Sequence, residues 1–151
     1  KMLIWHNFSD ERLTPYMSIN YYKQLAATVG GFDQVKKQVR LFMVPGTGHC
    51  SILGVAPNAF DPLTALEDWV EKGEAPDTLM ARVRDTQFVP GAPKAQALNY
   101  PDWTMPLCAF PAMARYRGTG NLKDGANWYC PPGDTAMLKV GETGRRAGAM
   151  Q

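Results

Sequence analysis

Two short apolar segments, each followed by a polar loop and an amphipathic helix, constrain this fold most strongly. Residues 2–5 (MLIW) suit a strand buried on both faces, and residues 39–44 (VRLFMV) form a second strand candidate. Apolar residues at helical spacing follow at 17–29, and a second helix is predicted after Asp61-Pro62, typical residues of a helix start. This order of strand, loop and helix, met twice, predicts half of an α/β unit with parallel strands.

The small number of strand candidates indicates that part of the sheet lies elsewhere. Residues 78–84 alternate as a strand would, whereas residues 86–134 hold most of the prolines and show no long periodic segment. Residues 32–38 are either a polar connector or one helical turn. Because two strands cannot form a stable sheet covered by helices on both faces, we expect this chain to be a piece of a longer protein.

Charge and hydropathy exclude two classes of protein. A net charge of +2, from 16 basic and 14 acidic residues, is too small and too dispersed for a surface that binds nucleic acid. No apolar run approaches the roughly 20 residues that span a bilayer, which excludes a membrane protein. The 45% of hydrophobic residues is typical of a globular domain and not of a disordered chain.

The three cysteines bear on the cellular compartment. Cys108 and Cys130 enclose a Gly-, Pro- and Asn-rich stretch, typical of a loop closed by a disulfide, and a disulfide would place the protein outside the cytosol. Two free buried thiols in a cytosolic protein are the alternative. An odd count leaves Cys50 without a partner inside the chain. No cysteine or histidine cluster has the spacing of a zinc site.

An acid and a histidine follow the two strand candidates in turn. Asp10 lies on the loop after the first strand, and His49 lies on the loop after the second. Reactive residues of open α/β sheets lie on such loops, and α/β-hydrolases place the last two members of their catalytic triad in this order. His49 would then transfer protons while Asp10 orients its ring. The alternative is that Asp10 is a turn residue and His49 an ordinary loop histidine.

A nucleophile for such a triad is missing. The chain has no G-x-S-x-G elbow, and its serines, Ser9, Ser18 and Ser51, do not lie on a strand-turn-helix elbow. We therefore expect the serine to lie outside this chain.

A resemblance to a known family rests on several long motifs. These are WH and Asp10 at 5–10, the Tyr-Tyr pair in the first helix, LFMVPGTGHC at 41–50, PNAFD at 57–61, ALEDWVEKGEAPD at 65–77 and RYRGTG at 115–120. In these motifs the sequence resembles the tannase/feruloyl esterase family. The resemblance covers residues 1 to about 130 and implies the C-terminal part of an α/β-hydrolase fold, with a mostly parallel sheet.

The resemblance also implies an organisation of the chain. Residues 1–77 would be the C-terminal end of the catalytic domain, carrying the triad acid and base. Residues 78–130 would be an extension packed on that domain and closed by a disulfide, and residues 131–151 a tail that matches nothing in the family. The family's inserted lid, with its structural calcium and most substrate contacts, would lie outside this chain, which itself is expected to bind no cofactor or metal.

Residue roles follow from the same resemblance. Asp10 would be the triad acid and His49 the base. The cysteine beside the histidine, here Cys50, forms a disulfide in this family with a cysteine directly before the nucleophilic serine, so its partner would lie outside this chain. Cys108 and Cys130 would form the family's closing disulfide.

Two further residues match positions beside the triad or in the substrate pocket of relatives. They are His6 and Leu13. For His6 the alternative is a histidine at a strand end bonded to nearby backbone, and for Leu13 it is a simple loop anchor. Two departures from the family stand nearby: Asn7 replaces a usual Gly, which Asn tolerates because it accepts positive φ, and Thr47 replaces a frequent Met, which alters packing.

The sequence therefore predicts the C-terminal segment of a secreted or periplasmic serine esterase that acts on galloyl, feruloyl or related aromatic esters. Its partner would be the N-terminal part of the same enzyme, which could be linked through Cys50, and the chain alone would be inactive. The alternative is a non-catalytic module that binds an aromatic ligand or another chain. Its binding surface would use Trp5, Tyr21, Tyr22 and Trp69, for which core packing is the competing interpretation.

Overall fold

A computed structural model describes residues 1–51, 56–83, 86–87, 96–97 and 103–133. Its larger elements are strands β1 (Met2–Asn7), β2 (Val39–Val44), β3 (Thr78–Arg82) and β6 (Thr104–Cys108) and helices α1 (Tyr16–Val29), α2 (Phe32–Val35) and α3 (Pro62–Glu71). The shorter elements are β4 (Thr86–Gln87), β5 (Gln96–Ala97), β7 (Arg115–Tyr116), β8 (Trp128–Tyr129) and the 3₁₀ turns η1 (His49–Ser51) and η2 (Gly125–Asn127). In this described part, no helix has the length and apolar character needed to span a bilayer.

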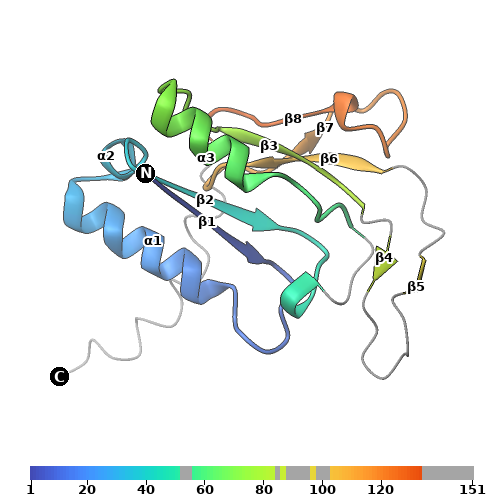
Figure 1. Ribbon diagram of the computed structural model, residues 1–151, viewed down its shortest axis with the longest axis horizontal. Helices are drawn as coiled ribbons and strands as arrows, with labels where there is room; N and C mark the ends of the chain where they lie inside the picture. Colours follow the sequence, from blue (N-terminus) through green and yellow to red (C-terminus); the bar gives the residue numbers. More distant parts are fainter. Residues whose placement is uncertain (52–55, 84–85, 88–95, 98–102, 134–151) are drawn as a thin grey trace.

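Strands β1 and β2 form the parallel pair that the sequence predicts. They are in register from Met2 opposite Val39 to Asn7 opposite Val44. Helix α1 lies on one side of this pair and α3 on the other (Figure 1). Side chains alternate along a strand, so neighbouring β2 residues serve the two sides: Leu41 packs in the α1 cluster and Phe42 in the cluster that includes α3.

Burial distinguishes the two strands and corrects one prediction. All of β2 is buried or nearly so, Arg40 included, whereas β1 leaves Trp5 50% exposed and Met2 38% exposed. The expectation that residues 2–5 are buried on both faces is wrong for this structure. Within the described residues β1 pairs with β2 alone, so its second edge is uncovered.

The helix boundaries follow local chemistry, as predicted. Helix α1 ends at Gly30, whose left-handed φ of 93° turns the chain so that the Gly31 N–H donates to the Ala26 carbonyl at 2.6 Å. Helix α3 begins after Asp61, whose carboxylate accepts the Thr64 N–H at 3.1 Å. Residues 32–38 contain the single turn α2.

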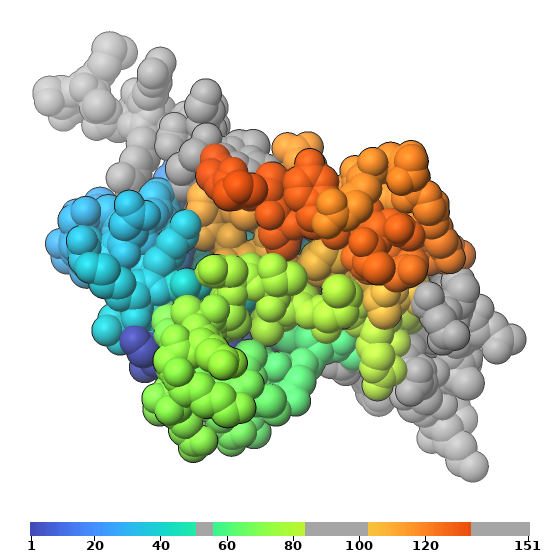
Figure 2. All heavy atoms as spheres, turned by 90° about the horizontal axis from the view of Figure 1, so that it is seen from above, coloured from blue at the N-terminus to red at the C-terminus, as the bar shows by residue number. Residues whose placement is uncertain are grey.

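Strands β3 and β6 form a second pair, which lies next to β2. Strand β3 keeps the predicted alternation and pairs antiparallel with β6, which the sequence did not predict. An isolated bridge between Phe42 and Ala109 joins this pair to β2. Seen from above, the orange residues of β6 to β8 lie alongside the yellow-green residues of β3 (Figure 2).

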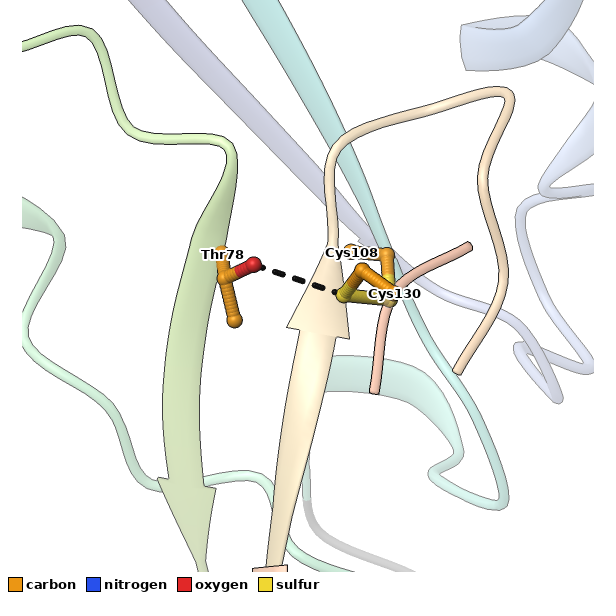
Figure 3. The surroundings of a disulfide bond; sticks show 3 residues. All are labelled: Thr78, Cys108 and Cys130. Carbon is orange, nitrogen blue, oxygen red and sulfur yellow. Dashed lines mark hydrogen bonds between the residues drawn. A yellow bond between two sulfur atoms is a disulfide. The ribbon is translucent and has the colours of Figure 1, made fainter. Parts of the chain in front are cut away.

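A disulfide between Cys108 and Cys130 closes the loop that follows β6. The two residues are separated by 22 positions, and the Thr78 hydroxyl on β3 donates to the Cys130 sulfur at 3.4 Å (Figure 3). Inside the loop, β7 pairs with β8, and the Arg117 N–H donates to the Asn127 carbonyl at 2.8 Å. The disulfide therefore ties a small two-stranded unit to the β3–β6 pair.

Removing this disulfide should loosen the loop it closes. Replacing both cysteines with alanine in the full-length protein should destabilise the closed loop by about 3 kcal/mol, the loop-closure entropy of a cross-link of this length. Amides within 109–129 should then exchange with deuterium roughly a hundredfold faster. Thr78→Val, which keeps the disulfide, should leave this exchange close to wild type. Equal exchange in the double-alanine variant and wild type would contradict the expectation.

Candidate active site

Asp10 and His49 meet because β1 and β2 are parallel and end together. Asn7 and Val44 are the last residues of the two strands and lie opposite each other. The loops continue side by side: the Phe8 N–H donates to the Val44 carbonyl at 2.7 Å. The carboxyl ends of neighbouring parallel strands thus carry both side chains at one edge of the sheet.

The Asp10 carboxylate binds one nitrogen of the His49 ring. Nδ1 of His49 lies 2.9 Å from Oδ2 and 3.1 Å from Oδ1 of Asp10. Because an ionised carboxylate can only accept, Nδ1 carries the proton and the neutral ring keeps its lone pair on Nε2. The His49 side chain is 27% exposed, so Nε2 can reach a group outside the described residues. This is the tautomer that a general base requires.

The backbone around Asp10 holds its carboxylate ionised. The side chain is 6% exposed, and Oδ1 accepts the N–H groups of Arg12 and Leu13, each at 2.9 Å. Burial by itself raises the pKa of Asp10, but the Leu13 N–H, the His49 ring and the Arg12 N–H outweigh it. The pKa of Asp10 therefore lies far below its ordinary value, and the carboxylate is charged at neutral pH.

His6 and Leu13 both lie next to Asp10. Nε2 of His6 is 3.1 Å from the Leu13 carbonyl, which can only accept, and Nδ1 is 2.8 Å from the Ser18 hydroxyl. The same Nε2 lies 3.6 Å from Asp10 Oδ2. His6 thus bonds to nearby backbone as the alternative interpretation expected, while the Leu13 side chain is 51% exposed and its backbone holds both Asp10 and His6. A role of either residue toward a substrate stays a prediction.

Gly46 and Thr47 determine the shape of the base loop, the loop after β2 that carries His49. Gly46 has a φ of +64°, and a Cβ there would lie 2.9 Å from the Cβ of Ala56, so glycine is required on two grounds. The Thr47 side chain is fully buried and donates to the Pro45 carbonyl at 3.2 Å. Its carbonyl accepts the Ser9 N–H at 3.1 Å.

Cys50 directly follows the histidine and has an unusual backbone. It is the one non-glycine residue with positive φ in the described ranges, at 52°, a conformation that costs about 1–2 kcal/mol. Its thiol is exposed and free. Of the predicted disulfide residues, the structure therefore pairs Cys108 with Cys130 and leaves Cys50 without a bond inside the described chain.

Two residues at the site were not predicted to act there. The Asn7 amide donates to the Gly48 carbonyl at 2.8 Å, and the Glu11 carboxylate accepts the His49 N–H at 3.2 Å. Asn7 replaces a glycine that is usual at this position in the family that the sequence resembles, but it does not adopt a positive φ. It is the last residue of β1, and its contribution here is the hydrogen bond of its side chain. The sequence did place both residues close to Asp10, which is a signal that they belong to the site. Their spacing, however, does not predict which group either side chain binds.

The described residues offer no metal site. Nowhere in these ranges do three His, Cys, Asp or Glu side chains gather closely enough to hold a metal ion.

The aromatic residues considered for a binding module are divided between core and surface. Tyr22 is fully buried, and Trp69 is 3% exposed beneath the Lys1 and Arg40 side chains. Trp5 and Tyr21 are each about half exposed, on β1 and α1 respectively. For Tyr22 and Trp69 the core interpretation is therefore the correct one.

Residues 1–131 match a family described as "Tannase and feruloyl esterase". The chain belongs to the tannase and feruloyl esterase family. The matched range contains the Asp10–His49 pair, the loops that carry it and both cysteines of the disulfide. Family members include carboxylic ester hydrolases, as the following relatives illustrate.

Two relatives are similar in sequence to this member of the tannase and feruloyl esterase family. Mono(2-hydroxyethyl) terephthalate hydrolase from Piscinibacter sakaiensis is 37% identical over 134 residues, which are 87% of this chain and 20% of that protein. A probable feruloyl esterase from Arthroderma benhamiae is 39% identical over 133 residues, which are 86% of this chain and 22% of that protein. The chain therefore spans about a fifth of the length of these relatives.

Solved structures of the tannase and feruloyl esterase family share the fold. Feruloyl esterase B from Aspergillus oryzae matches with a TM-score of 0.69 and 25% identity, over 87% of this chain and 26% of that one. Tannin acyl hydrolase from Aspergillus niger matches with a TM-score of 0.61 and 26% identity, over 87% and 22% of the two chains. These likenesses are consistent with an α/β-hydrolase type of fold.

Proposed function

We propose that this chain is the C-terminal segment of a serine esterase that hydrolyses aromatic carboxylic esters, galloyl, feruloyl or related. The observation that carries the proposal is the 2.9 Å bond between His49 Nδ1 and Asp10, at the shared end of two parallel strands. Asp10 is the triad acid and His49 the base, and the nucleophilic serine lies in the part of the protein outside these residues. The similarity to feruloyl esterases and a tannin acyl hydrolase supports the aromatic ester class.

The chemistry follows from the tautomer of His49. Nε2 takes the serine proton as the serine oxygen attacks the ester carbonyl, and Asp10 stabilises the imidazolium that forms. When the tetrahedral intermediate collapses, His49 gives that proton to the departing alcohol and leaves an acyl-enzyme. Water then attacks the acyl group in the same way, with His49 first as base and then as acid, and releases the carboxylic acid.

The partner of this segment is the N-terminal part of the same enzyme. In this proposal Cys50 forms a disulfide with a cysteine beside the nucleophilic serine, which joins the base loop to the nucleophile loop. The exposed thiol next to His49 supports such a link. The disulfide at Cys108 and Cys130 supports a secreted or periplasmic enzyme, since disulfides persist in oxidising compartments. A structural calcium in the lid stays an expectation outside this chain, and residues 1–151 alone should be inactive.

An assay of the full-length protein tests the proposal. The panel is methyl ferulate, methyl gallate and mono(2-hydroxyethyl) terephthalate, with ethyl acetate as the non-aromatic ester. We expect hydrolysis of at least one aromatic ester with kcat/KM far above that for ethyl acetate. A folded full-length protein that hydrolyses none of these esters would contradict the function, and preference for ethyl acetate would contradict the aromatic substrate class.

A further inference from the structure

One peptide group at the site is held at both of its polar atoms by side chains of the other loop. The carbonyl of Gly48 and the N–H of His49 belong to the same peptide unit. Asn7 Nδ2 donates to that carbonyl at 2.8 Å, and Glu11 Oε2 accepts that N–H at 3.2 Å. Both side chains come from the segment that carries Asp10, and they stand on either side of it in the sequence.

We propose that Asn7 and Glu11 are positioning residues that clamp the Gly48–His49 peptide and thereby set the direction of the His49 ring. This inference rests on the proposed function, in which His49 is the base. It assigns a role in the reaction to two residues that contact neither the substrate nor the reacting atoms and that act through the backbone of His49.

The geometry explains why a clamp at this peptide matters. The C=O and N–H of a planar peptide point in opposite directions, so fixing both prevents the unit from rotating about its neighbouring single bonds. On the other side of His49, Cys50 adopts its left-handed φ of 52°. His49 therefore stands between a fixed peptide and a strained residue, and a rotation of this peptide would swing the ring away from Asp10. A misplacement of about 1 Å can cost an enzyme roughly a hundredfold in rate.

The two arms of the clamp differ in environment. The bond from Asn7 is partly buried, whereas the Glu11 side chain is 51% exposed and also lies 3.8 Å from the Arg12 guanidinium. Hydrogen bonds from its own N–H and from the His49 N–H lower the pKa of Glu11, so it accepts as a carboxylate. Because water competes less for a partly buried bond, the Asn7 arm should contribute more than the Glu11 arm.

The test uses the full-length protein with four variants: Asn7→Ala, Glu11→Ala, their combination and Glu11→Gln, which keeps an acceptor oxygen. Asn20→Ala on α1 and Glu67→Ala on α3 are matched controls, since both side chains are exposed on helices. The readouts are kcat and KM for an aromatic ester, the unfolding temperature, and hydrogen exchange of the His49 amide in protein labelled with ¹⁵N-histidine. The amide readout reports on the clamp without any substrate.

The clamp predicts a specific pattern. Asn7→Ala should lower kcat about tenfold and Glu11→Ala by a smaller factor, each with KM and unfolding temperature near wild type, because the ring is misdirected and the fold is intact. The double variant should lose about as much as the worse single one, since one released end already frees the peptide. Glu11→Ala should speed exchange of the His49 amide, and Glu11→Gln should restore both exchange and kcat to within about twofold of wild type.

Other results would contradict the proposed clamp of Asn7 and Glu11. Unchanged exchange of the His49 amide in Glu11→Ala would show that this bond is absent. Losses of kcat that multiply in the double variant, or that match those of Asn20→Ala and Glu67→Ala, would show that the two residues do not share one peptide. A wild-type protein without esterase activity would overturn the proposed function instead, and the exchange rates would then decide the clamp by themselves.

Discussion

Replacing His49 with alanine in the full-length enzyme should lower kcat for aromatic esters by at least about 10⁴-fold, because the serine loses its base and the leaving alcohol its acid. KM should change little, because the His49 ring is bonded to Asp10 and its proton transfer stabilises mainly the transition state. Steady-state kinetics with saturating ester measure both constants.

Folding must be controlled in that experiment. The His49 side chain is 27% exposed and lies on a loop, so its truncation should leave the unfolding temperature within a few degrees of wild type. A variant that keeps more than a tenth of wild-type kcat would show that another group deprotonates the nucleophile. The triad assignment would then be wrong.

Replacing Asp10 with asparagine should lower kcat by on the order of 10⁴-fold while leaving the ring in place. The amide of asparagine can donate to Nδ1, which moves the ring proton to Nε2 and blocks the nitrogen that must act as base. Asp33→Asn is the matched control, because Asp33 is an exposed carboxylate on α2. Equal rates for Asp10→Asn and Asp33→Asn would contradict the role of Asp10.

The same variant should change how stability depends on pH. The ordinary pKa of this carboxyl is 3.8, and the bonds from Leu13, His49 and Arg12 lower it in the folded state. The ionised carboxylate therefore stabilises the fold above about pH 4 and loses that contribution as pH falls through the folded pKa. Urea unfolding between pH 7 and pH 2 should show a deficit of Asp10→Asn that shrinks toward low pH. A constant deficit would contradict the lowered pKa.

Local sequence signals predicted the elements that local chemistry determines. Asp61 and Pro62 start α3, Gly30 ends α1, and the apolar run at 39–44 is β2 as expected. Parallel strands that end together also bring Asp10 and His49 to the same edge, which chain order alone could indicate.

Local sequence signals could not predict contacts between residues that lie far apart in the chain. Strand β6 depends on pairing with β3 and contains Pro106, a residue that argues against a strand when only the sequence is read. The clamp joins Asn7 to Gly48 and Glu11 to His49 across 41 and 38 positions, and no periodicity relates such pairs. The exposure of β1 likewise depends on what covers its second edge.

Phosphonylation tests directly whether Asp10 and His49 activate a serine, and it requires no knowledge of the substrate. The rate at which a fluorophosphonate adds to the full-length protein is followed by intact mass, and the modified residue is located by peptide sequencing. We predict one adduct per molecule, on a serine outside residues 1–151, formed at least about a hundredfold more slowly in His49→Ala. An adduct that forms equally fast in His49→Ala, or no adduct on the folded wild-type protein, would contradict the account.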